Sequence, residues 1–353
     1  MLLAFDGAAF CRSLDSIDRV LRVLVHAVQH AGWDLEIWTQ GDLRPDAARF
    51  RPWVRPWSAH AQSSADVLWS PDIGFPQCDV PVVATLHDVN PLLPDGRGRV
   101  ERWIRGRRFR RRVGRCLAQA DHVVTDTENA RGRVAGAFPQ CTQRLSVVPL
   151  FVDPDIQPLK GERGTGLLEG LGISPGFILF VGSLRRHKNW DGLIRAYAAL
   201  PASLRERHAL VFAGRAARAG SEAERLAGAL GVRDRVRLLG VVDEEVLHAL
   251  YGAARLLACP SFMEGFGFPP LEAMACGLPV VATDRTCVPE VLGDAGVYVN
   301  PASIESITGG LASVLEDEEK YDRLVEAGRR QAGRYGPART AAAMKEVFAR
   351  LSS

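Results

Sequence analysis

The second half of the chain alternates short apolar runs with helical patterns, and this alternation constrains its fold more than any other feature. Apolar runs with the length of a strand occupy residues 177–181, 210–213, 236–239, 256–259, 280–283 and 297–299. Helical patterns separate them, at residues 190–200, 221–230, 243–253, 270–276 and 288–292. Runs that are apolar throughout indicate strands buried on both faces, and a helix between successive strands indicates parallel pairing. The sequence therefore predicts an α/β domain built on a doubly wound parallel sheet.

The first half repeats this pattern more faintly. The N-terminal residues M-L-L-A-F-D-G are predicted as a first strand rather than a signal peptide, because they lack a basic segment and a long apolar run. Further strands are expected at residues 82–85, 122–125 and 145–149. Residues 149–166 are rich in Pro, Gly and charge, which is the composition of a linker, and we expect the boundary between residues 152 and 165. The length of 353 residues suits two domains, at residues 1–158 and 159–336.

Two carboxylates flank a predicted helix start within residues 260–284. Glu264 lies in the loop before the helix, which is expected to begin near Pro269 or Pro270, and Glu272 lies in its first turn. Gly277 is a good residue to end the helix. Backbone N–H groups at such a start can bind an anion such as a diphosphate, and carboxylates accept hydrogen bonds from hydroxyls. A diphosphate flanked by two polyols is a nucleotide sugar; the alternative is an ordinary helix with two surface glutamates.

Residues 264–282 read E-G-F-G-F-P-P-L-E-A-M-A-C-G-L-P-V-V-A. This run resembles the signature of the retaining glycosyltransferases of family 4, E-G-F-G-x-x-x-x-E-A-x-A-x-G-x-P-V-x-A, and matches it position by position. The resemblance implies the GT-B fold, with two Rossmann-like doubly wound parallel-sheet domains facing an interdomain cleft. It also implies that the first domain binds the acceptor, that the second binds the nucleotide sugar, and that the last helix, residues 337–353, packs back on the first.

The resemblance assigns roles to the residues of this segment. Glu264 is expected to contact the donor sugar and to be catalytic, and Glu272 to contact the ribose. The amides of the intervening loop are expected to contact the diphosphate; they belong to Gly265, Phe266, Gly267 and Phe268. A softer match around residues 240–251 predicts backbone contacts from Gly240 and Val242 to the base.

A second group of candidate residues follows the expected strand at 177–181 and reads V-G-S-L-R-R-H-K-N-W. Lys188 is expected to act as a point charge on the diphosphate and to stabilise the departing nucleoside diphosphate. Family members resemble this run as G-T-L-E-P-R-K-N, so His187 replaces the usual Arg, and Ser183 stands at the alternative Arg position. Arg186, its neighbour Arg185, or protonated His187 can supply the second cation. The alternative is a basic surface turn.

In the first half, V-V-A-T-L-H-D-V-N-P places His87 and Asp88 directly after an expected buried strand. The family carries a similar strand-His-Asp, so His87 is expected to be catalytic and to hydrogen-bond the donor sugar or the acceptor, with Asp88 on the acceptor side. The alternative is a strand-end His bonded to a neighbouring backbone group. Near the N-terminus the family often has G-I-G-R, whereas this chain has S-I-D-R. Asp18 therefore faces away from a diphosphate, changes the acceptor contact, or simply belongs to the first helix, since Ser16 has the pattern of an N-cap.

No metal-ligand cluster and no D-x-D motif in a suitable context occur in the sequence, so no metal and no cofactor beyond the nucleotide-sugar co-substrate is expected. The seven cysteines are scattered and odd in number, which predicts free thiols in a reducing cytosol. Retention of the anomeric configuration is implied by the family. No residue has the pattern of a covalent nucleophile, which favours same-face attack.

Residues 97–115 read R-G-R-V-E-R-W-I-R-G-R-R-F-R-R-R-V-G-R. Arginines interleaved with Trp and Phe predict contact with an anionic membrane surface, for which Arg107, Arg108 and Arg111 are candidates, or with the acceptor. RNA and a solvated helix are the alternatives, with RNA the least favoured. No run of eighteen apolar residues occurs, so the expected location is the cytoplasm or the inner face of the cytoplasmic membrane.

The favoured function is transfer of a hexose from a nucleotide sugar to a glycan or lipid-linked acceptor in cell-surface polysaccharide synthesis. The Lys188 loop looks most like that of bacterial mannosyltransferases, which implies GDP-mannose as a possible donor. A Rossmann-type oxidoreductase is disfavoured, because no G-x-G-x-x-G follows the first strand. The alternative retained is a non-catalytic protein with a GT-B-like fold that binds sugar nucleotides or nucleic acid.

Overall fold

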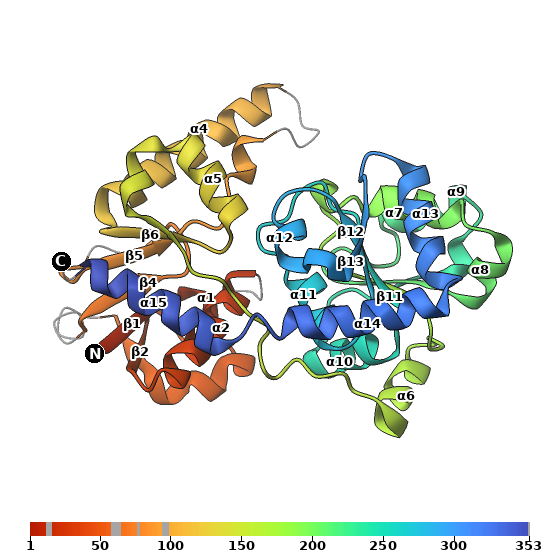
Figure 1. Cartoon of the computed structure of the whole chain (residues 1–353), viewed down its shortest axis with the longest axis horizontal. Coiled ribbons are helices and arrows are strands. Elements are labelled where there is room, and N and C mark those ends of the chain that lie inside the picture. The colour runs from red at the N-terminus through yellow and green to blue at the C-terminus, as the bar shows by residue number, and fades with distance from the viewer. Residues whose placement is uncertain (12–15, 58–64, 76–77, 94–98, 352–353) are drawn as a thin grey trace. The chain divides into compact units, whose positions relative to one another are not determined.

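The computed structural model describes residues 1–11, 16–57, 65–75, 78–93 and 99–351 (Figure 1). The chain forms two compact units: unit 1 comprises Met1–Asp153 and Tyr335–Ser353, and unit 2 comprises Pro154–Arg334. The division falls inside the linker expected between residues 152 and 165. Each unit has its own parallel sheet, and the predicted pair of Rossmann-like α/β domains is confirmed.

Unit 1 contains a parallel sheet with the order β3-β2-β1-β4-β5-β6-β7. Its strands are β1 (Leu2–Asp6), β2 (Asp34–Thr39), β3 (Val54–Pro56), β4 (Val67–Ser70), β5 (Val82–Thr85), β6 (His122–Thr125) and β7 (Leu145–Val147). Its α-helices are α1 (Ala8–Cys11), α2 (Ser16–His30), α4 (Arg99–Gln119), α5 (Glu128–Ala137) and α15 (Pro337–Leu351). Three 3₁₀ segments complete the described part of unit 1: η1 (Pro45–Trp53), η2 (Asn90–Leu92) and η3 (Pro139–Arg144).

The C-terminal helix α15 belongs to unit 1 although it follows unit 2 in the sequence. It packs along α2, and the Phe348 ring lies 5.3 Å from the ring of Trp33 and 5.9 Å from that of Trp69. The Thr340 hydroxyl donates to the Pro149 carbonyl oxygen at 2.6 Å. Aromatic packing and this hydrogen bond therefore attach the last helix to the first unit.

Unit 2 contains a parallel sheet with the order β10-β9-β8-β11-β12-β13. Its strands are β8 (Ile178–Val181), β9 (Leu210–Ala213), β10 (Val236–Leu238), β11 (Leu256–Cys259), β12 (Val280–Thr283) and β13 (Gly296–Val299). All six expected strands are present, each within one residue of the predicted bounds. The order reverses direction between β8 and β11, and such a switch point is where doubly wound sheets bind ligands.

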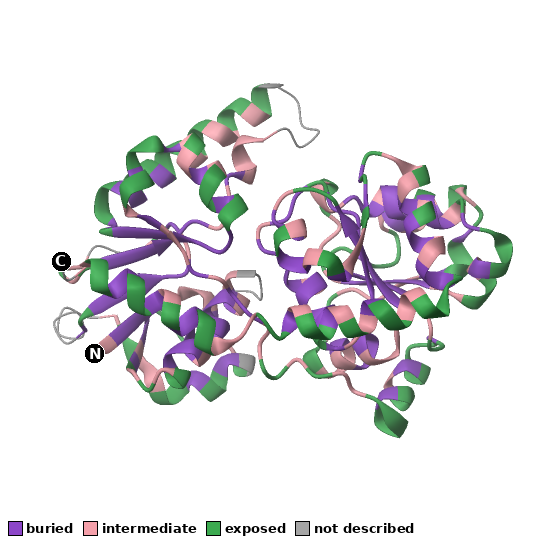
Figure 2. Cartoon of the chain, viewed as in Figure 1, coloured by how far each residue is buried: buried purple, intermediate pink, exposed green. Residues whose placement is uncertain are grey.

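Helices cover both faces of the unit 2 sheet (Figure 1). They are α6 (Gly161–Gly170), α7 (Trp190–Ala198), α8 (Ala202–Arg207), α9 (Glu222–Ala229), α10 (Glu244–Ala253), α11 (Phe268–Ala275), α12 (Val288–Leu292), α13 (Ile304–Leu315) and α14 (Glu318–Ala332). Single-turn 3₁₀ segments are η4 (Arg186–Lys188), η5 (Arg233–Arg235) and η6 (Gly293–Ala295). In both units the central strands of the sheet are buried, whereas the helices expose one side (Figure 2).

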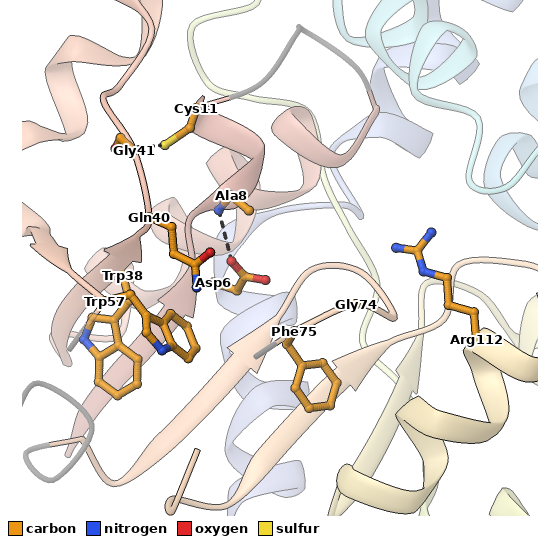
Figure 3. Close-up of a pocket in the computed structure, with 10 residues that line it drawn as sticks. All are labelled: Asp6, Ala8, Cys11, Trp38, Gln40, Gly41, Trp57, Gly74, Phe75 and Arg112. Atoms are coloured by element: carbon orange, nitrogen blue, oxygen red, sulfur yellow. Dashed lines mark hydrogen bonds between the residues drawn. The ribbon is translucent and has the colours of Figure 1, made fainter. Parts of the chain in front are cut away.

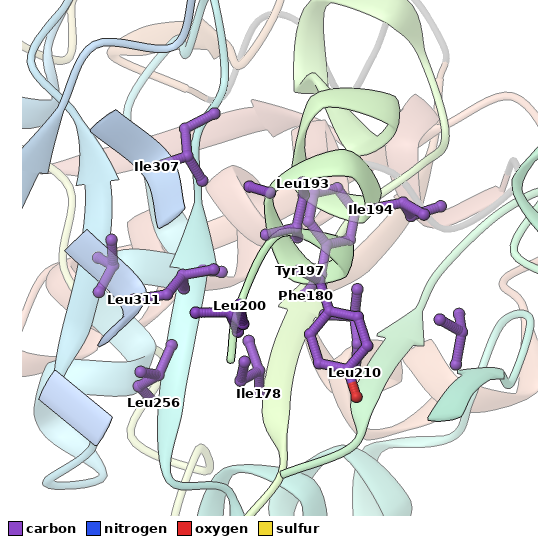
Figure 4. Packing of buried hydrophobic residues seen from close by; sticks show 14 of the residues in the cluster. Ile178, Phe180, Leu193, Ile194, Tyr197, Leu200, Leu210, Leu256, Ile307 and Leu311 are labelled. Carbon is purple, nitrogen blue, oxygen red and sulfur yellow. The ribbon is translucent and has the colours of Figure 1, made fainter. Parts of the chain in front are cut away.

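The core of unit 2 forms where α7 and α13 cover one face of the sheet (Figure 4). Phe180 and Phe212 project from neighbouring strands, with ring centroids 5.0 Å apart, and Tyr197 of α7 packs in the same cluster. The Tyr197 hydroxyl donates to the His208 carbonyl oxygen at 2.9 Å, so its polar end is satisfied. Full burial of one such side chain contributes about 2–3 kcal/mol. This packing holds the carboxyl ends of β8 and β11 in fixed positions.

Candidate functional site at the carboxyl edge of the unit 2 sheet

Two loops meet at the switch point of the unit 2 sheet. One follows β8 and carries Lys188; the other follows β11 and carries Glu264. Because β8 and β11 are hydrogen-bonded neighbours in parallel, their carboxyl ends lie side by side. The two sequence segments, 76 residues apart, therefore form one site.

The Lys188 ammonium and the Glu264 carboxylate form a close ion pair. Lys188 Nζ donates to both carboxylate oxygens, at 2.8 Å to Oε1 and 2.7 Å to Oε2. The Glu264 side chain is 6% exposed and the Lys188 side chain 18% exposed. Burial alone would raise the pKa of Glu264, but Lys188 and the nearby hydrogen-bond donors hold that pKa below its usual range. Both groups are therefore charged and held in direct contact.

Further side chains of the β11 loop hold the Glu264 carboxylate. The Ser261 hydroxyl, fully buried, donates to Oε1 at 2.6 Å, and the Cys259 thiol donates to the same oxygen at 3.4 Å. The Cys287 thiol donates to the Glu264 carbonyl oxygen at 3.4 Å. Sequence reasoning did not identify these contacts. The P-S-F-M-E spacing carries a weak signal for Ser261, because a hydroxyl three residues before a loop carboxylate can reach it.

Asn189 joins the two loops. Its backbone has φ 55°, a left-handed conformation that Asn tolerates well. Its side-chain nitrogen, Nδ2, donates to the carbonyl oxygens of Pro260 and Pro301 at 3.0 and 2.8 Å. The Phe262 amide donates to the His187 carbonyl oxygen at 2.7 Å. These bonds fix the relative positions of Lys188 and Glu264, which is the preorganisation that charge stabilisation requires.

The remaining predicted residues of the Lys188 loop lie close to the surface. Arg186 is exposed, while Ser183 and His187 are half-buried. The Ser183 carbonyl oxygen accepts from the Arg185 amide at 2.7 Å, which closes the turn into η4. The prediction that Arg185, Arg186 or protonated His187 supplies the second cation stays a prediction.

Helix α11 begins at Phe268, one or two residues before the predicted start. Gly267 takes φ 95°, which a glycine adopts without strain, so the helix begins ahead of the prolines rather than at them. Glu272 consequently lies in the second turn of α11, and its predicted placement in the first turn is wrong. Pro269 has no amide hydrogen, nor has the next residue, so backbone donors near this start come from the loop residues 265–268.

The loop and the end of α11 are well defined. The Phe266 and Phe268 rings are both buried and lie 5.1 Å apart in a T-shaped arrangement. Gly265 is half-buried and Gly267 is buried, so the loop backbone follows a constrained path. At the other end, Gly277 has φ 73° and Leu278 N donates to the Ala273 carbonyl oxygen at 2.8 Å, as expected for a glycine that ends a helix.

Glu272 is more deeply placed than the sequence indicated. Its side chain is 2% exposed, and Oε2 accepts from the Tyr251 hydroxyl of α10 at 2.6 Å. Gly240 takes φ 75°. Its backbone amide donates to the Ala217 carbonyl oxygen at 2.5 Å, and its own carbonyl oxygen accepts from the Gly214 amide at 2.6 Å. Val242, half-buried, precedes α10. The predicted ribose contact of Glu272 and base contacts of Gly240 and Val242 remain predictions.

In unit 1, His87 connects three strand ends. Its Nδ1 lies 2.6 Å from Asp126 Oδ2, after β6, and its Nε2 lies 2.8 Å from the Pro71 carbonyl oxygen, after β4. Both ring nitrogens face acceptors, so both carry hydrogens. Burial alone would lower the pKa of His87, but Asp126 and the carbonyl oxygen raise it to about 9. The expected contact with a sugar would require His87 to give up one of these partners.

Asp88 holds the turn that follows β5. Its Oδ1 accepts from the Asn90 backbone amide at 2.8 Å and its Oδ2 from the Asn90 side-chain amide at 2.7 Å. Asp18 lies in α2, is 1% exposed, and pairs with Arg22 at 2.9 Å and Arg44 at 2.5 Å. Two guanidinium groups therefore compensate the charge of this buried carboxylate.

The arginine-rich segment forms helix α4, although Arg97 lies outside the described residues. Its C-terminal half packs inward: Val113 is buried, and the Phe109 ring lies 6.3 Å from that of Phe138. Its N-terminal half exposes Trp103 by 61% and Ile104 by 40%. The exposed side chains include Arg107, Arg108 and Arg111, and the Arg107 guanidinium lies 4.9 Å from the Trp103 ring centroid. Within the described residues, helices long and apolar enough to cross a membrane do not occur.

Two Rossmann-like parallel-sheet domains, the second with a Lys–Glu pair at its switch point, define a protein of the GT-B class. The sequence model of the family described as Glycosyl transferases group 1 matches residues 170–331, and that of Glycosyltransferase Family 4 matches residues 59–156. O-antigen chain mannosyltransferase B of Escherichia coli is 31% identical over 340 residues, which are 95% of this chain and 86% of the relative. The chain therefore belongs to the family 4 glycosyltransferases.

Other relatives differ in what their names say they act on. The D-inositol 3-phosphate glycosyltransferase of Xylanimonas cellulosilytica is 31% identical over 339 residues, 89% of this chain and 76% of the relative. Among solved structures, WaaG, a glycosyltransferase involved in lipopolysaccharide biosynthesis, is similar with a TM-score of 0.74 and 21% identity over 97% of this chain and 98% of that one. HepE of Anabaena in complex with UDP and glucose has a TM-score of 0.76 and 18% identity, covering 99% of both chains. These structures support the fold.

Proposed function

We propose that this glycosyltransferase transfers mannose from GDP-mannose, with retention of configuration and without a metal ion, to a glycan or lipid-linked acceptor in cell-surface polysaccharide synthesis. The observation that carries the proposal is the buried Lys188–Glu264 pair at the switch point of the unit 2 sheet. Support for mannose comes from the name of the relative in Escherichia coli, an O-antigen chain mannosyltransferase.

The ion pair suggests how the donor is received. The Lys188 ammonium lies 2.7 Å from Oε2 of Glu264, the residue that precedes the loop amides, 265–268, proposed to bind the diphosphate. When the diphosphate arrives, it competes with Glu264 for the Lys188 ammonium. Lys188 then stabilises the negative charge that grows on the departing nucleoside diphosphate, so no metal ion is needed for that task. Ser261 continues to hold Glu264 Oε1, which leaves Oε2 to accept a hydrogen bond from a hydroxyl of the sugar.

The other assignments complete the proposed site. Glu272, kept in place by Tyr251, accepts from the ribose, and the backbone around Gly240 and Val242 contacts the base. No covalent enzyme intermediate is invoked. The acceptor hydroxyl attacks the face of the sugar from which the phosphate leaves, and the departing phosphate oxygen takes the acceptor proton. The acceptor is assigned to unit 1.

A transfer assay tests this proposal. The protein is incubated with a mannoside acceptor and one donor, GDP-mannose, UDP-glucose or dTDP-rhamnose, in the presence of EDTA. The anomeric configuration of the product is read from its one-bond C1–H1 coupling constant in the NMR spectrum. We expect turnover with GDP-mannose that EDTA does not reduce, and an α-linked product. Activity restored only by a divalent cation would contradict the metal-free proposal, and turnover with another donor alone would contradict the donor assignment.

We further propose that α4 attaches the protein to the cytoplasmic membrane surface. The support is the exposed Trp103 beside exposed Arg107, Arg108 and Arg111, since aromatic and cationic side chains together favour anionic interfaces. Sedimentation with phosphatidylglycerol vesicles should decline as salt is raised. The triple substitution to serine should reduce the bound fraction severalfold, whereas Arg323→Ser on exposed α14 should not. Equal sedimentation of both variants would contradict the proposal.

A further inference from the structure

A third loop reaches the Lys188–Glu264 site. It spans residues 284–287, between β12 and α12, and it lies beside the β11 loop because β11 and β12 are hydrogen-bonded parallel neighbours. The Thr286 hydroxyl oxygen accepts from the Glu264 amide at 3.3 Å, and the Cys287 thiol donates to the Glu264 carbonyl oxygen at 3.4 Å. These two loop residues therefore hold both backbone groups of Glu264.

The Thr286 hydroxyl has a fixed direction. It donates to the carbonyl oxygen of Arg285 at 2.7 Å, so its hydrogen is used and a lone pair is left for the Glu264 amide. The loop itself is attached to the next strand, because the Asp284 amide donates to the Val299 carbonyl oxygen of β13 at 3.1 Å. The acceptor that the Glu264 amide meets is thus anchored by its own loop.

Thr286 holds this position against its own backbone preference. Its φ is 60°, in the left-handed range, where a β-branched residue is an outlier because its side chain crowds the backbone. Among the described residues, the other non-glycine residues with positive φ are Asn189 and Ala216, neither of which is β-branched. Glycine would adopt this conformation without strain. The backbone shape alone therefore does not account for a threonine here, whereas the bond from its hydroxyl to Glu264 does.

The contact also differs from an ordinary local bond between a side chain and a backbone amide. At the end of β1, the Asp6 carboxylate accepts from the Ala8 amide at 3.0 Å, two residues further along the chain (Figure 3). A bond of that kind shapes one turn. The bond between Thr286 and Glu264 joins two loops that are 22 residues apart, and one of these loops carries the candidate catalytic carboxylate. Its loss would change the position of Glu264 relative to β12.

We propose that Thr286 is a positioning residue for sugar transfer, whose hydroxyl fixes the backbone of Glu264, and through it the carboxylate, in spite of the strain at its own φ. The inference rests on the proposed transferase function, in which Glu264 contacts the donor sugar. It adds the loop after β12 to the two loops, after β8 and β11, that form the site. Thr286 touches the backbone of Glu264 alone, so its effect should appear in transfer of the sugar rather than in binding of the nucleotide.

Transfer kinetics with GDP-mannose test this role. Thr286→Val keeps the branched shape but loses the hydroxyl, and we expect kcat to fall about tenfold while the Kd for GDP changes by less than about twofold. Thr286→Ser keeps the hydroxyl and should stay within about twofold of the wild type. Thr142→Val is the matched control: the Thr142 hydroxyl of unit 1 also bonds a local carbonyl oxygen, that of Pro139 at 2.8 Å, and its removal should leave transfer unchanged.

Thr286→Gly separates positioning from a purely structural role. Glycine relieves the strain at this φ but also removes the hydroxyl, so Tm should lie about 2–4 °C above that of Thr286→Val while kcat stays as low. Activity that rises and falls with Tm across the valine, serine and glycine variants would overturn the inference, because Thr286 would then serve only the stability of the fold.

Hydrogen exchange at the Glu264 amide, measured on the full chain, examines the contact without any transfer reaction. The exchange rate should rise about tenfold in Thr286→Val and stay near the wild-type rate in Thr286→Ser. If the wild-type protein transferred no sugar but exchange rose in Thr286→Val, the contact would stand and the proposed function would fail. Unchanged exchange at Glu264, or wild-type transfer by Thr286→Val, would overturn the inference and leave the proposed function standing.

Discussion

Replacing Ser261 by alanine tests whether the Glu264 carboxylate is positioned by its own loop. The Ser261 hydroxyl is fully buried and lies 2.6 Å from Oε1, a short hydrogen bond to a charged acceptor. Such bonds contribute about 1.5–3 kcal/mol. In the protein without ligand, Lys188 still contacts both oxygens after the substitution, so the carboxylate keeps a partner. We therefore expect the free energy of unfolding to fall by about 1.5 kcal/mol, near the lower limit.

The effect on catalysis should be larger. Once the diphosphate draws Lys188 away, Ser261 is the strongest donor that Glu264 retains, because the Cys259 thiol is a weak one at 3.4 Å. A loss of about 2 kcal/mol at that stage corresponds to a decrease of about thirtyfold in kcat/KM. Binding of the nucleoside diphosphate without its sugar should change by less than about threefold, since Ser261 acts only through Glu264.

Steady-state transfer kinetics, calorimetric titration with GDP and chemical unfolding measure these three quantities. Thr283→Val is a matched control: Thr283 is fully buried in β12, and among the described residues its hydroxyl has no hydrogen-bond partner. Removing that hydroxyl should leave stability unchanged or raise it. Ser261→Thr, which keeps the hydroxyl, should recover part of the activity. If Ser261→Ala leaves transfer within twofold of the wild type, Glu264 is not positioned in this way.

Two further predictions concern the sheet edges. The pKa of His87 is raised to about 9, so its pairing with Asp126 stabilises the fold fully below pH 6.5, and this stabilisation is lost as the pH rises through 9. Asp126→Asn should therefore lower the free energy of unfolding by on the order of 3 kcal/mol at pH 6 and by little above pH 10, as measured by urea unfolding. Equal losses at both pH values would contradict this. A Cβ at Gly214 would lie 2.1 Å from the Gly182 carbonyl oxygen at φ 146°, so Gly214→Ala should destabilise by more than about 3 kcal/mol or prevent folding. Gly228→Ala, in open space on α9, should stabilise by about 0.5–1 kcal/mol, and a similar effect of both changes would refute the steric argument.

The sheet of unit 2 was predictable because its strands are short, mostly apolar and separated by helices. In unit 1, β2 reads D-L-E-I-W-T and β3 is V-R-P, so neither has a continuous apolar run, and both escaped prediction. β2 acquires strand geometry from pairing with β1, and β3 from pairing with β2, which a local pattern does not encode.

The sequence was sufficient to predict which two loops form the candidate site, but not the contacts within it. Lys188 and Glu264 follow neighbouring strands of a parallel sheet, so their proximity follows from topology alone. The hydrogen bonds to the two ring nitrogens of His87 come from residues 16 and 39 positions away in the sequence. Their geometry depends on how three strand ends align. The depth of Glu272 likewise depends on Tyr251 of another helix. Partners that are so far apart in the sequence produce no local residue pattern from which their contact could be predicted.

Calorimetric titration with GDP-mannose, GDP and GMP in EDTA is the most direct test of the central claim, which is that Lys188 and Glu264 form a metal-independent site for a nucleotide sugar. The account predicts that GDP binds at least about tenfold more tightly than GMP, because the second phosphate meets Lys188. Lys188→Met should remove that difference, and Glu264→Gln should remove only the extra affinity that mannose adds to GDP. Equal binding of GDP and GMP by the wild-type protein, or full affinity in Lys188→Met, would contradict the account.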